Sequence, residues 1–339
     1  MKILILGDTH FGCRNDNPVF YYHFEKFYNM MFQYCIENNI DTIFQLGDLF
    51  DKRKNINFKT LEFAKNVFFD KFEKMNIQLY SLTGNHDIFY RESTKLNSSI
   101  VLNNPFIKIF DKPYTIHLDN TTIDIVPWIC KDNKEEILSF INNSTSDLCF
   151  GHLELNNFPM YKGIVSESGK MEENIFSKYE LVCTGHYHTK SNKDNIHYVG
   201  TPYEMTWMDY NDPKGFDIFD TITRELSFII NNNTVFEVIE YDESNLPNLP
   251  DLTNKFLKII IKNRTDHYQF DKFLNGLNCF DIKILDNEVV QLIESTESDI
   301  PSSTIDVIYQ YIDNSSIDKK IEVKDFLKTL YIETINGVE

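Results

Sequence analysis

The chain lacks two features that would assign it to a common class of protein. Its six cysteines lie far apart and include no CxxC pair, which argues against disulfides and against a thiolate metal site, so we expect reduced thiols. No apolar run approaches the roughly 20 residues that a membrane-spanning helix needs. The first apolar run, residues 3–6, ends at Gly7 and is too short for a signal peptide. These absences predict a cytoplasmic protein with no membrane contact.

The chain is also short of positive charge. It has 33 Lys and Arg against 51 Asp and Glu, a formal net charge of −18. Because Lys and Arg supply most of the affinity for a DNA backbone, this balance favours a small-molecule or protein substrate. Cation-binding carboxylates and local basic clusters weaken that argument. An acidic nuclease would be expected to gain DNA affinity from a partner. The hydrophobic content of 42% is sufficient for a large core.

Five strand-like apolar runs end at Asp, Asn or His, usually beside Gly. They are ILILGDTH, TIFQLGDLFD, LYSLTGNHD, LCFGHLE and LVCTGHYH. Open α/β folds place their sites at the carboxyl ends of such strands, so we expect the polar side chains to converge. They are Asp8, His10, Asp48, Asp51, Asn85, His86, Asp87, His152, His186 and His188.

The residue types indicate metal chemistry. Carboxylate, amide and imidazole ligands suit Mn(II), Fe(II) or Zn(II). Two such cations about 3.5–4 Å apart activate water and hold both oxygens of an in-line displacement at phosphorus. A single strand that ends in Gly-Asp is common, because Gly and Asp often begin a turn. Five such motifs in this order favour a two-metal site.

The motif series resembles the calcineurin-like metallophosphoesterase superfamily over residues 1–230. GDLFD, the later GHYH and then YVGTP are similar to the SbcD-type DNA repair nucleases. PWIC, GHLELNNF and NDPKGFDIFD resemble phage members of that group. The resemblance implies a two-metal exonuclease and endonuclease that works with an SbcC-type coiled-coil ATPase, binds DNA and forms a homodimer in that complex. Mn(II) is the first candidate metal, with Fe, Zn or Mg as others.

The resemblance also implies a role for each motif residue. Asp8, His10 and His188 would hold one metal, Asn85, His152 and His186 the other, and Asp48 would bridge them. His86 would stabilise or protonate the leaving alkoxide. Asp87 would orient an imidazole or, equally, cap a turn, and Asp51 would lie near the metals without binding them strongly.

Basic residues follow three of the motifs. They are candidates for DNA binding, although solvated loop charge explains each of them equally well. These residues are Arg14, Lys52, Arg53, Lys54 and Arg91.

The order of patterns predicts an α/β fold. Apolar periodicity predicts helices over residues 18–38 and 58–74, and a strand over 77–82. Residues 106–126 predict hairpins. Strands near 148–150, 181–183, 196–199, 216–219 and 225–230 predict a second, largely antiparallel sheet. Together with the resemblance, these elements imply a four-layer αββα sandwich.

The remaining chain predicts further parts. Residues 1–241 form the nuclease domain, and residues 242–251, rich in Pro, Asn and acidic residues, form a linker. Residues 252–300 predict a small α/β capping domain with a helix near 270–276. Residues 301–339 predict two amphipathic helices that dock on the ATPase or pack on their own domain.

Three other functions fit parts of the sequence. A small-molecule or cyclic-nucleotide phosphodiesterase of the same superfamily agrees with the acidic composition. A Ser/Thr protein phosphatase fits less well, because that branch continues its GD motif as VDRG. A scaffold without activity is disfavoured by the complete ligand set.

Overall fold

The computed structural model describes residues 1–102, 104–161, 164–166 and 171–286, and isolated positions at 312, 320, 323, 324 and 327. Two compact units divide the chain. The first comprises Met1–Ile239, Asn248–Lys258 and Asp271–Lys283, and the second takes Glu240–Pro247, Ile259–Phe270 and the chain from Ile284. The helical pair predicted for residues 301–339 lies outside the described residues apart from the isolated positions. No helix in the described ranges is long and apolar enough to cross a membrane.

The first six-stranded sheet has the order β16-β15-β1-β2-β3-β6. Its four strands from β1 to β6 run parallel, whereas β15 pairs antiparallel with β1. The bounds are β1 Lys2–Leu6, β2 Thr42–Gln45, β3 Gln78–Leu82, β6 Ile107–Phe110, β15 Gly215–Asp220 and β16 Leu226–Ile230.

Two expectations about this sheet are wrong. β15 and β16, assigned from the sequence to the second sheet, pair beside β1, and β6 pairs parallel with β3 instead of forming a hairpin. Lys2 of β1 faces Asp220 of β15, so strands more than 200 residues apart are neighbours. Such long-range pairing leaves no local signal in the sequence.

The second six-stranded sheet has the order β13-β14-β12-β9-β8-β7. The prediction that it is largely antiparallel is wrong, because β8, β9, β12 and β14 run parallel. The predicted hairpin of β7 and β8 is confirmed. The bounds are β7 Tyr114–Leu118, β8 Thr121–Val126, β9 Leu148–His152, β12 Leu181–Gly185, β13 Ser191–Lys193 and β14 Ile196–Tyr198.

Helix α2, Pro18–Asn38, is confirmed at both ends. Asn17 accepts a hydrogen bond from the Val19 amide and precedes a proline at the first helical position, while Asn39 ends the helix in the left-handed conformation. The second predicted helix is interrupted by a π-helical turn: α3 is Phe58–Ala64, η1 is Lys65–Phe69 and α4 is Asp70–Met75. Helix α5 is Lys134–Asn143.

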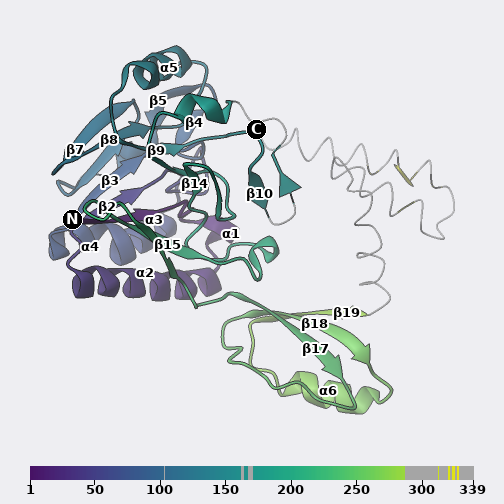
Figure 1. Cartoon of the computed structure of the whole chain (residues 1–339). Helices are drawn as coiled ribbons and strands as arrows, with labels where there is room; N and C mark the ends of the chain where they lie inside the picture. The colour runs from purple at the N-terminus through teal and green to yellow at the C-terminus, as the bar shows by residue number, and fades with distance from the viewer. Residues whose placement is uncertain are drawn as a thin grey trace. The chain divides into compact units, whose positions relative to one another are not determined.

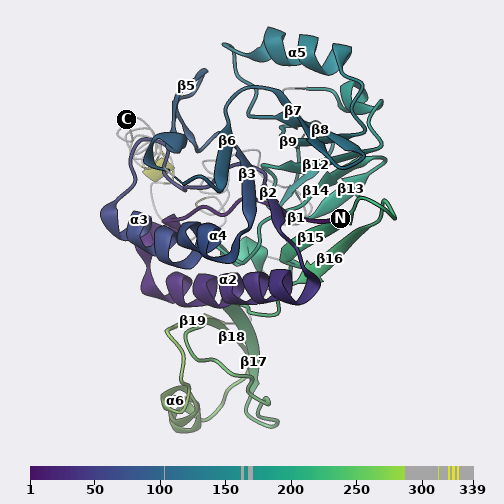
Figure 2. The ribbon, with the colours of Figure 1, turned by 90° about the vertical axis from the view of Figure 1, so that its left-hand side faces the viewer.

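Three hydrophobic cores order the layers of this unit. Leu4 and Leu6 of β1 pack with apolar residues of α2 to α4, whereas Ile3 and Ile5 on the opposite face pack against the second sheet. Ile137 and Ile141 of α5 pack with Cys149 and Val182 on the outer face of that sheet. The order is therefore helix, sheet, sheet and helix, and Figure 2 shows α2 to α4 on one side and α5 on the other.

Shorter elements connect these layers. They are α1 Cys13–Asp16, β4 Ile88–Tyr90, β5 Ser93–Asn97, η2 Ser98–Val101, β10 Pro159–Tyr161, β11 Ile164–Val165, η3 Glu173–Phe176 and η4 Trp207–Asp209.

A three-stranded sheet of order β17-β18-β19, with helix α6, follows in the chain (Figure 1). The bounds are β17 Phe236–Asp242, β18 Phe256–Asn263, α6 His267–Asn275 and β19 Asp281–Asp286. The sequence also predicts strands over residues 256–262 and 280–285, which β18 and β19 confirm. The helix predicted near 270–276 begins three residues earlier, at His267. Asp242, assigned to the linker, is the last residue of β17.

Candidate metal centre

The predicted ligands gather where strands of both sheets end. Asp8 follows β1, Asp48 follows β2 and Asn85 follows β3, all in the parallel part of the first sheet. His152 ends β9 and His186 follows β12, two neighbouring parallel strands of the second sheet. Because neighbouring parallel strands end at the same edge of a sheet, the residues that follow them lie side by side at that edge.

One group of donors comprises Asp8, His10 and His188. A carboxylate oxygen or ring nitrogen from each lies within 4.8 Å of the others. The two Nε2 atoms of His10 and His188 are 3.2 Å apart, and His188 Nε2 is 3.9 Å from Asp8 Oδ2. Ligands of one cation bound at about 2.0–2.2 Å stand roughly 3 Å apart, so this group fits a single ion.

A second group comprises Asp48, His152 and His186, again within 4.8 Å of one another. Asn85 Oδ1 lies 2.9 Å from both His152 Nε2 and His186 Nδ1. Asp48 Oδ2 is 3.5 Å from His152 Nε2 and 3.8 Å from His10 Nε2. Asp48 therefore lies between the two groups, where a bridging ligand would stand.

The hydrogen bonds of His152 leave its Nε2 as the atom that could bind a cation. Its Nδ1 lies 2.7 Å from the carbonyl oxygen of Leu46, which only accepts, so Nδ1 carries the proton. Burial lowers the pKa of His152, which makes the imidazole neutral and leaves a lone pair on Nε2. That lone pair meets the oxygen of Asn85, another acceptor. A cation bound by both atoms would remove this unfavourable contact between two acceptors. The Leu46 carbonyl orients the imidazole ring for such binding.

The buried charges also fit bound cations. Asp8 is 1% exposed and Asp48 2%. Burial, reinforced by the charge of Asp48, raises the pKa of Asp8 well above its usual value. Two carboxylates close together in a dry site are costly without positive charge, so this pair suits divalent cations.

The backbone is strained at the predicted ligands. His10, Asp48 and His186 have φ values of 43°, 54° and 92°, in the left-handed region that non-glycine residues rarely adopt and that clusters at functional sites. A Cβ on Gly47, whose φ is 94°, would lie 2.5 Å from His152 Nδ1. Gly therefore precedes Asp48 because no side chain fits there.

His86 lies beside both groups without belonging to either. Its Nδ1 is 2.5 Å from the carbonyl oxygen of Asp51, so Nδ1 donates and Nε2 is the atom available to a substrate. Its ring centroid is 4.9 Å from that of His10, edge to face. Asp51 itself approaches His10, with Oδ1 3.7 Å from Nδ1, and donor atoms of His10, Asp51 and His86 lie within 4.8 Å of one another.

The Asp87 carboxylate holds the neighbouring backbone in place. It accepts hydrogen bonds from the amides of Gly84 and Leu49 and from the hydroxyl of Ser98. Burial, reinforced by the charge of Asp48, raises the pKa of Asp87 to about 7. Of the two roles considered for Asp87, these contacts favour turn capping over orientation of an imidazole.

Three of the predicted DNA-binding residues are anchored near the centre. The Nε atoms of Arg14 and Arg53 donate to the carbonyls of Met205 and Asn85 at 2.7 and 2.9 Å, and Lys52 donates to Asn15. Lys54 and Arg91 are exposed. Partial burial and the charge of Arg91 lower the pKa of Arg53, so these two guanidinium groups are neighbours.

Several residues that support the ligands have no role assigned to them from the sequence. Lys214 donates to the carbonyl of His188, and the Tyr203 hydroxyl donates to the carbonyl of Thr9, between Asp8 and His10. The ring of Trp128 lies 5.0 Å from that of His186 and 5.8 Å from that of His152. Trp128 lies in the PWIC segment and Lys214 in NDPKGFDIFD, so the sequence marks their segments, but the fold is needed to show what these side chains contact.

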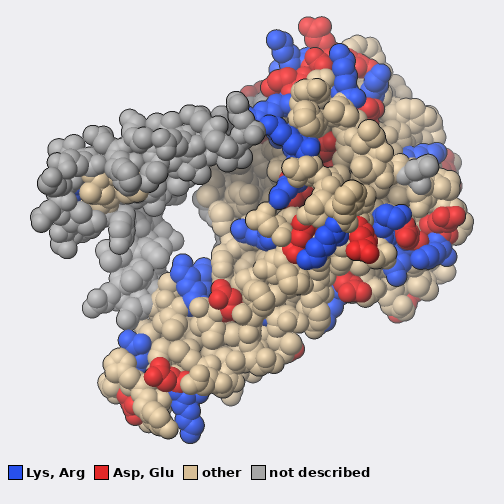
Figure 3. All heavy atoms as spheres, turned by 180° about the vertical axis from the view of Figure 1, so that it is seen from behind, with Lys and Arg blue, Asp and Glu red and all other residues tan. Residues whose placement is uncertain are grey.

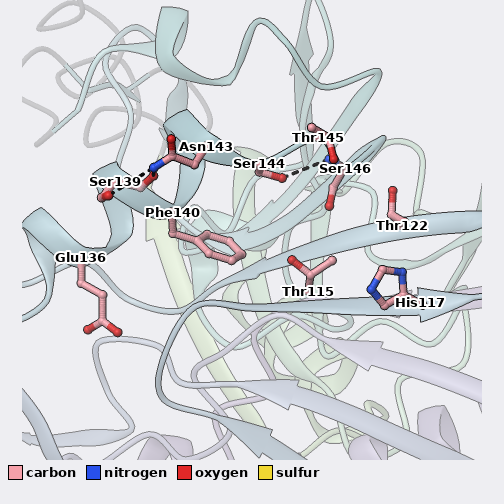
Figure 4. Close-up of a pocket in the computed structure, with 10 residues that line it drawn as sticks. All are labelled: Thr115, His117, Thr122, Glu136, Ser139, Phe140, Asn143, Ser144, Thr145 and Ser146. Carbon is pink, nitrogen blue, oxygen red and sulfur yellow. Dashed lines mark hydrogen bonds between the residues drawn. The ribbon is translucent and has the colours of Figure 1, made fainter.

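A separate cavity of about 570 Å³ lies between the β7–β8 hairpin and α5 (Figure 4). Hydroxyl and amide side chains dominate its lining, with His117 and Glu136 among them. Ser144 and Ser146 stand before β9, whereas His152 ends that strand. The cavity is therefore at the opposite end of the strand from the metal centre.

Comparison with known proteins gives the family. The calcineurin-like phosphoesterase family model matches residues 1–190. Exonuclease subunit 1 of Enterobacteria phage T4 is 36% identical over 296 residues, which cover 85% of this chain and 86% of the phage protein. A solved archaeal phosphodiesterase has 16% identity and a TM-score of 0.36, covering 68% of this chain and 100% of its own. A Mycoplasma pneumoniae phosphatase has 14% identity and a TM-score of 0.38, covering 68% of this chain and 93% of its own. By the family model and the phage relative, this chain belongs to the calcineurin-like phosphoesterase family.

Proposed function

We propose that this chain is a metal-dependent DNA nuclease that hydrolyses phosphodiester bonds in DNA recombination, repair or replication. The observation that supports it most is the convergence of seven metal-type donors in a chain 36% identical to a phage exonuclease subunit. The proposed ligands are Asp8, His10, Asp48, Asn85, His152, His186 and His188. Mn(II) is the first candidate for both ions.

The proposed chemistry is in-line hydrolysis. The two groups of donors would hold two divalent cations, which would supply an activated water and offset charge on the phosphoryl oxygens. The protein holds the donors rigidly: the Asp8 carboxylate accepts the His186 amide at 3.1 Å, and the Asp48 carboxylate accepts the His86 amide at 2.7 Å. These bonds link the ends of different strands to the Asp8 and Asp48 ligands before substrate arrives.

His86 is the proposed general acid. With Nδ1 bonded to the Asp51 carbonyl, a protonated His86 presents Nε2–H, which can donate to the leaving sugar oxygen. Asp87 acts through the loop that carries His86, because its carboxylate fixes the amides of Gly84 and Leu49.

The acidic composition supports a partner in DNA binding. Basic and acidic side chains are mixed on the face in Figure 3, so that face alone is a weak DNA-binding surface. The phage relative is by name a subunit. We propose that an SbcC-type coiled-coil ATPase is the partner, that residues 301–339 dock on it, and that the chain is a homodimer in the complex.

A direct test measures cleavage of end-labelled linear DNA by the purified chain in Mn(II), alone and with the ATPase subunit. EDTA and Asp8→Ala should abolish degradation. Turnover of a small phosphodiester while DNA stays intact, even with the partner present, would instead support a small-molecule phosphodiesterase, which the net charge of −18 favours.

A further inference from the structure

A cavity of about 330 Å³ opens beside His86. One wall is the basic segment Lys52–Lys54, which follows β2. The facing wall is apolar and comes from β4, β5 and η2, with Phe89, Leu96, Ile100 and Val101. A cavity with one cationic wall and one apolar wall suits a ligand that is anionic at one edge and flat and apolar at the other.

The apolar wall is unusually exposed for its composition. Ile100 is 76% exposed, and Leu96 and Val101 are each 38% exposed. Single exposed apolar residues are ordinary, but several together, edged by Lys and Arg, are typical of a binding surface.

The wall is attached to the catalytic loop. The Ser98 amide donates to the Asp87 carbonyl at 2.8 Å and the Ser98 hydroxyl to the Asp87 carboxylate at 3.0 Å. Asp87 directly follows His86, so these bonds hold η2 at a fixed position relative to the proposed general acid. On the other wall, Arg53 Nε donates to the Asn85 carbonyl, which leaves the end of its guanidinium for a phosphate.

We propose that this cavity binds the unpaired nucleoside that carries the leaving oxygen of the cleaved phosphodiester. Its base packs against Phe89 and Ile100, and the adjoining phosphate contacts Arg53. Because the cavity is beside His86, a nucleoside held there places its sugar oxygen near the group that protonates it. This inference rests on the proposed nuclease function and specifies which part of the DNA is recognised.

The chemistry of the two walls predicts a preference for unpaired ends. A base inside a duplex is stacked on both faces and must leave the stack to enter a side cavity. An aromatic or apolar wall accepts any base, because every base offers a flat face. The cavity therefore predicts tolerance of sequence together with sensitivity to loss of the base.

The test uses single-stranded oligonucleotides with one scissile bond and an abasic residue on one side or the other. For the wild-type chain loaded with Mn(II), we expect the abasic residue to slow cleavage about 10-fold on the leaving-oxygen side only. Phe89→Ala and Ile100→Ala should slow cleavage of normal DNA about 10-fold and of that abasic DNA little. Ile222→Ala is the matched control, because Ile222 is 82% exposed and lies outside this cavity.

The outcomes separate the two claims. If wild type cleaves no oligonucleotide, either alone or with the ATPase subunit, the proposed function fails and the inference fails with it. If wild type cleaves DNA and the abasic residue has no effect on either side, or the variants slow both substrates equally, the nuclease stands and the cavity assignment is wrong. If Phe89→Ala does not fold, Ile100→Ala decides alone, since its side chain is mostly exposed.

Discussion

Lys214 donates a hydrogen bond of 2.9 Å to the backbone carbonyl of His188, a predicted metal ligand 26 residues earlier in the chain. Lys214 is 4% exposed, and its ammonium group also pairs with Asp209 at 2.9 Å and Asp212 at 2.7 Å. The three donors of the ammonium group thus meet three acceptors. The His188 carbonyl also accepts the Thr201 amide, so the position of this ligand depends on residues far from it in sequence.

Lys214→Met should therefore weaken both folding and metal binding. Losing the cation leaves Asp209 buried and unpaired, at a cost of about 3–5 kcal/mol in the free energy of unfolding. The double variant with Asp209→Asn should recover part of that stability. Metal affinity, measured by competition with a chelator, should remain about 10-fold or more below wild type in both variants.

Lys190→Met provides the matched control. Lys190 pairs with the buried Asp217 at 2.5 Å. Among the described residues this pair makes no hydrogen bond to a predicted ligand, so the variant should lose stability while keeping metal affinity. An equal loss of metal affinity in both variants would show that Lys214 acts only through general stability.

The leaving group should decide how much His86 matters. His86→Ala should reduce cleavage of DNA at least ~100-fold, because the sugar alkoxide needs a proton. Hydrolysis of a p-nitrophenyl phosphodiester releases p-nitrophenolate, a stable anion that needs no proton. Turnover of this substrate should therefore fall far less. Rates of wild type and variant on both substrates, with metal content measured in each, test this; equal losses would exclude a role in protonation.

Removing negative charge from the centre should separate metal-free from metal-loaded stability. Asp8→Asn removes the cost of burying the Asp8 carboxylate and its repulsion by Asp48, so the metal-free chain should gain about 1–3 kcal/mol in the free energy of unfolding. The same variant should lose most of the rise in melting temperature that Mn(II) gives the wild type. Thermal unfolding with EDTA and with Mn(II) measures both, and a lower metal-free stability would contradict this account.

What the sequence predicts well is what short segments determine. The strand ends at Asp48 and Asn85 could be read directly, because an apolar run that stops at Gly and a polar residue is a local pattern, and parallel strands bring such ends together. Helix α2 can also be predicted from local sequence, because its signals, which are Asn17, Pro18 and the apolar periodicity, all lie within the helix or next to it.

What the sequence could not predict depends on distant partners. β15 pairs with β1 across about 200 residues, and its alternation of apolar residues fits either sheet. The π-helical turn at Lys65–Phe69 lies in a stretch with ordinary helical periodicity. Lys214 lies in the NDPKGFDIFD segment, but no local pattern predicts its contact with His188, which only the folded chain shows.

Glu204 predicts a dependence of stability on pH. It is 3% exposed and accepts the amides of Val235 and Phe236, yet burial raises its pKa from 4.5 to about 7. Between those pH values Glu204 keeps a proton in the folded chain that it has lost in the unfolded chain. The contribution of Glu204 to the free energy of unfolding is therefore complete below pH ~4.5 and is lost as the pH rises to about 7. At 1.36 kcal/mol per pKa unit, the loss is about 3 kcal/mol. Denaturant unfolding of wild type and Glu204→Gln at several pH values tests this: the variant should lack this contribution, and a difference between the two that does not change with pH would disprove it.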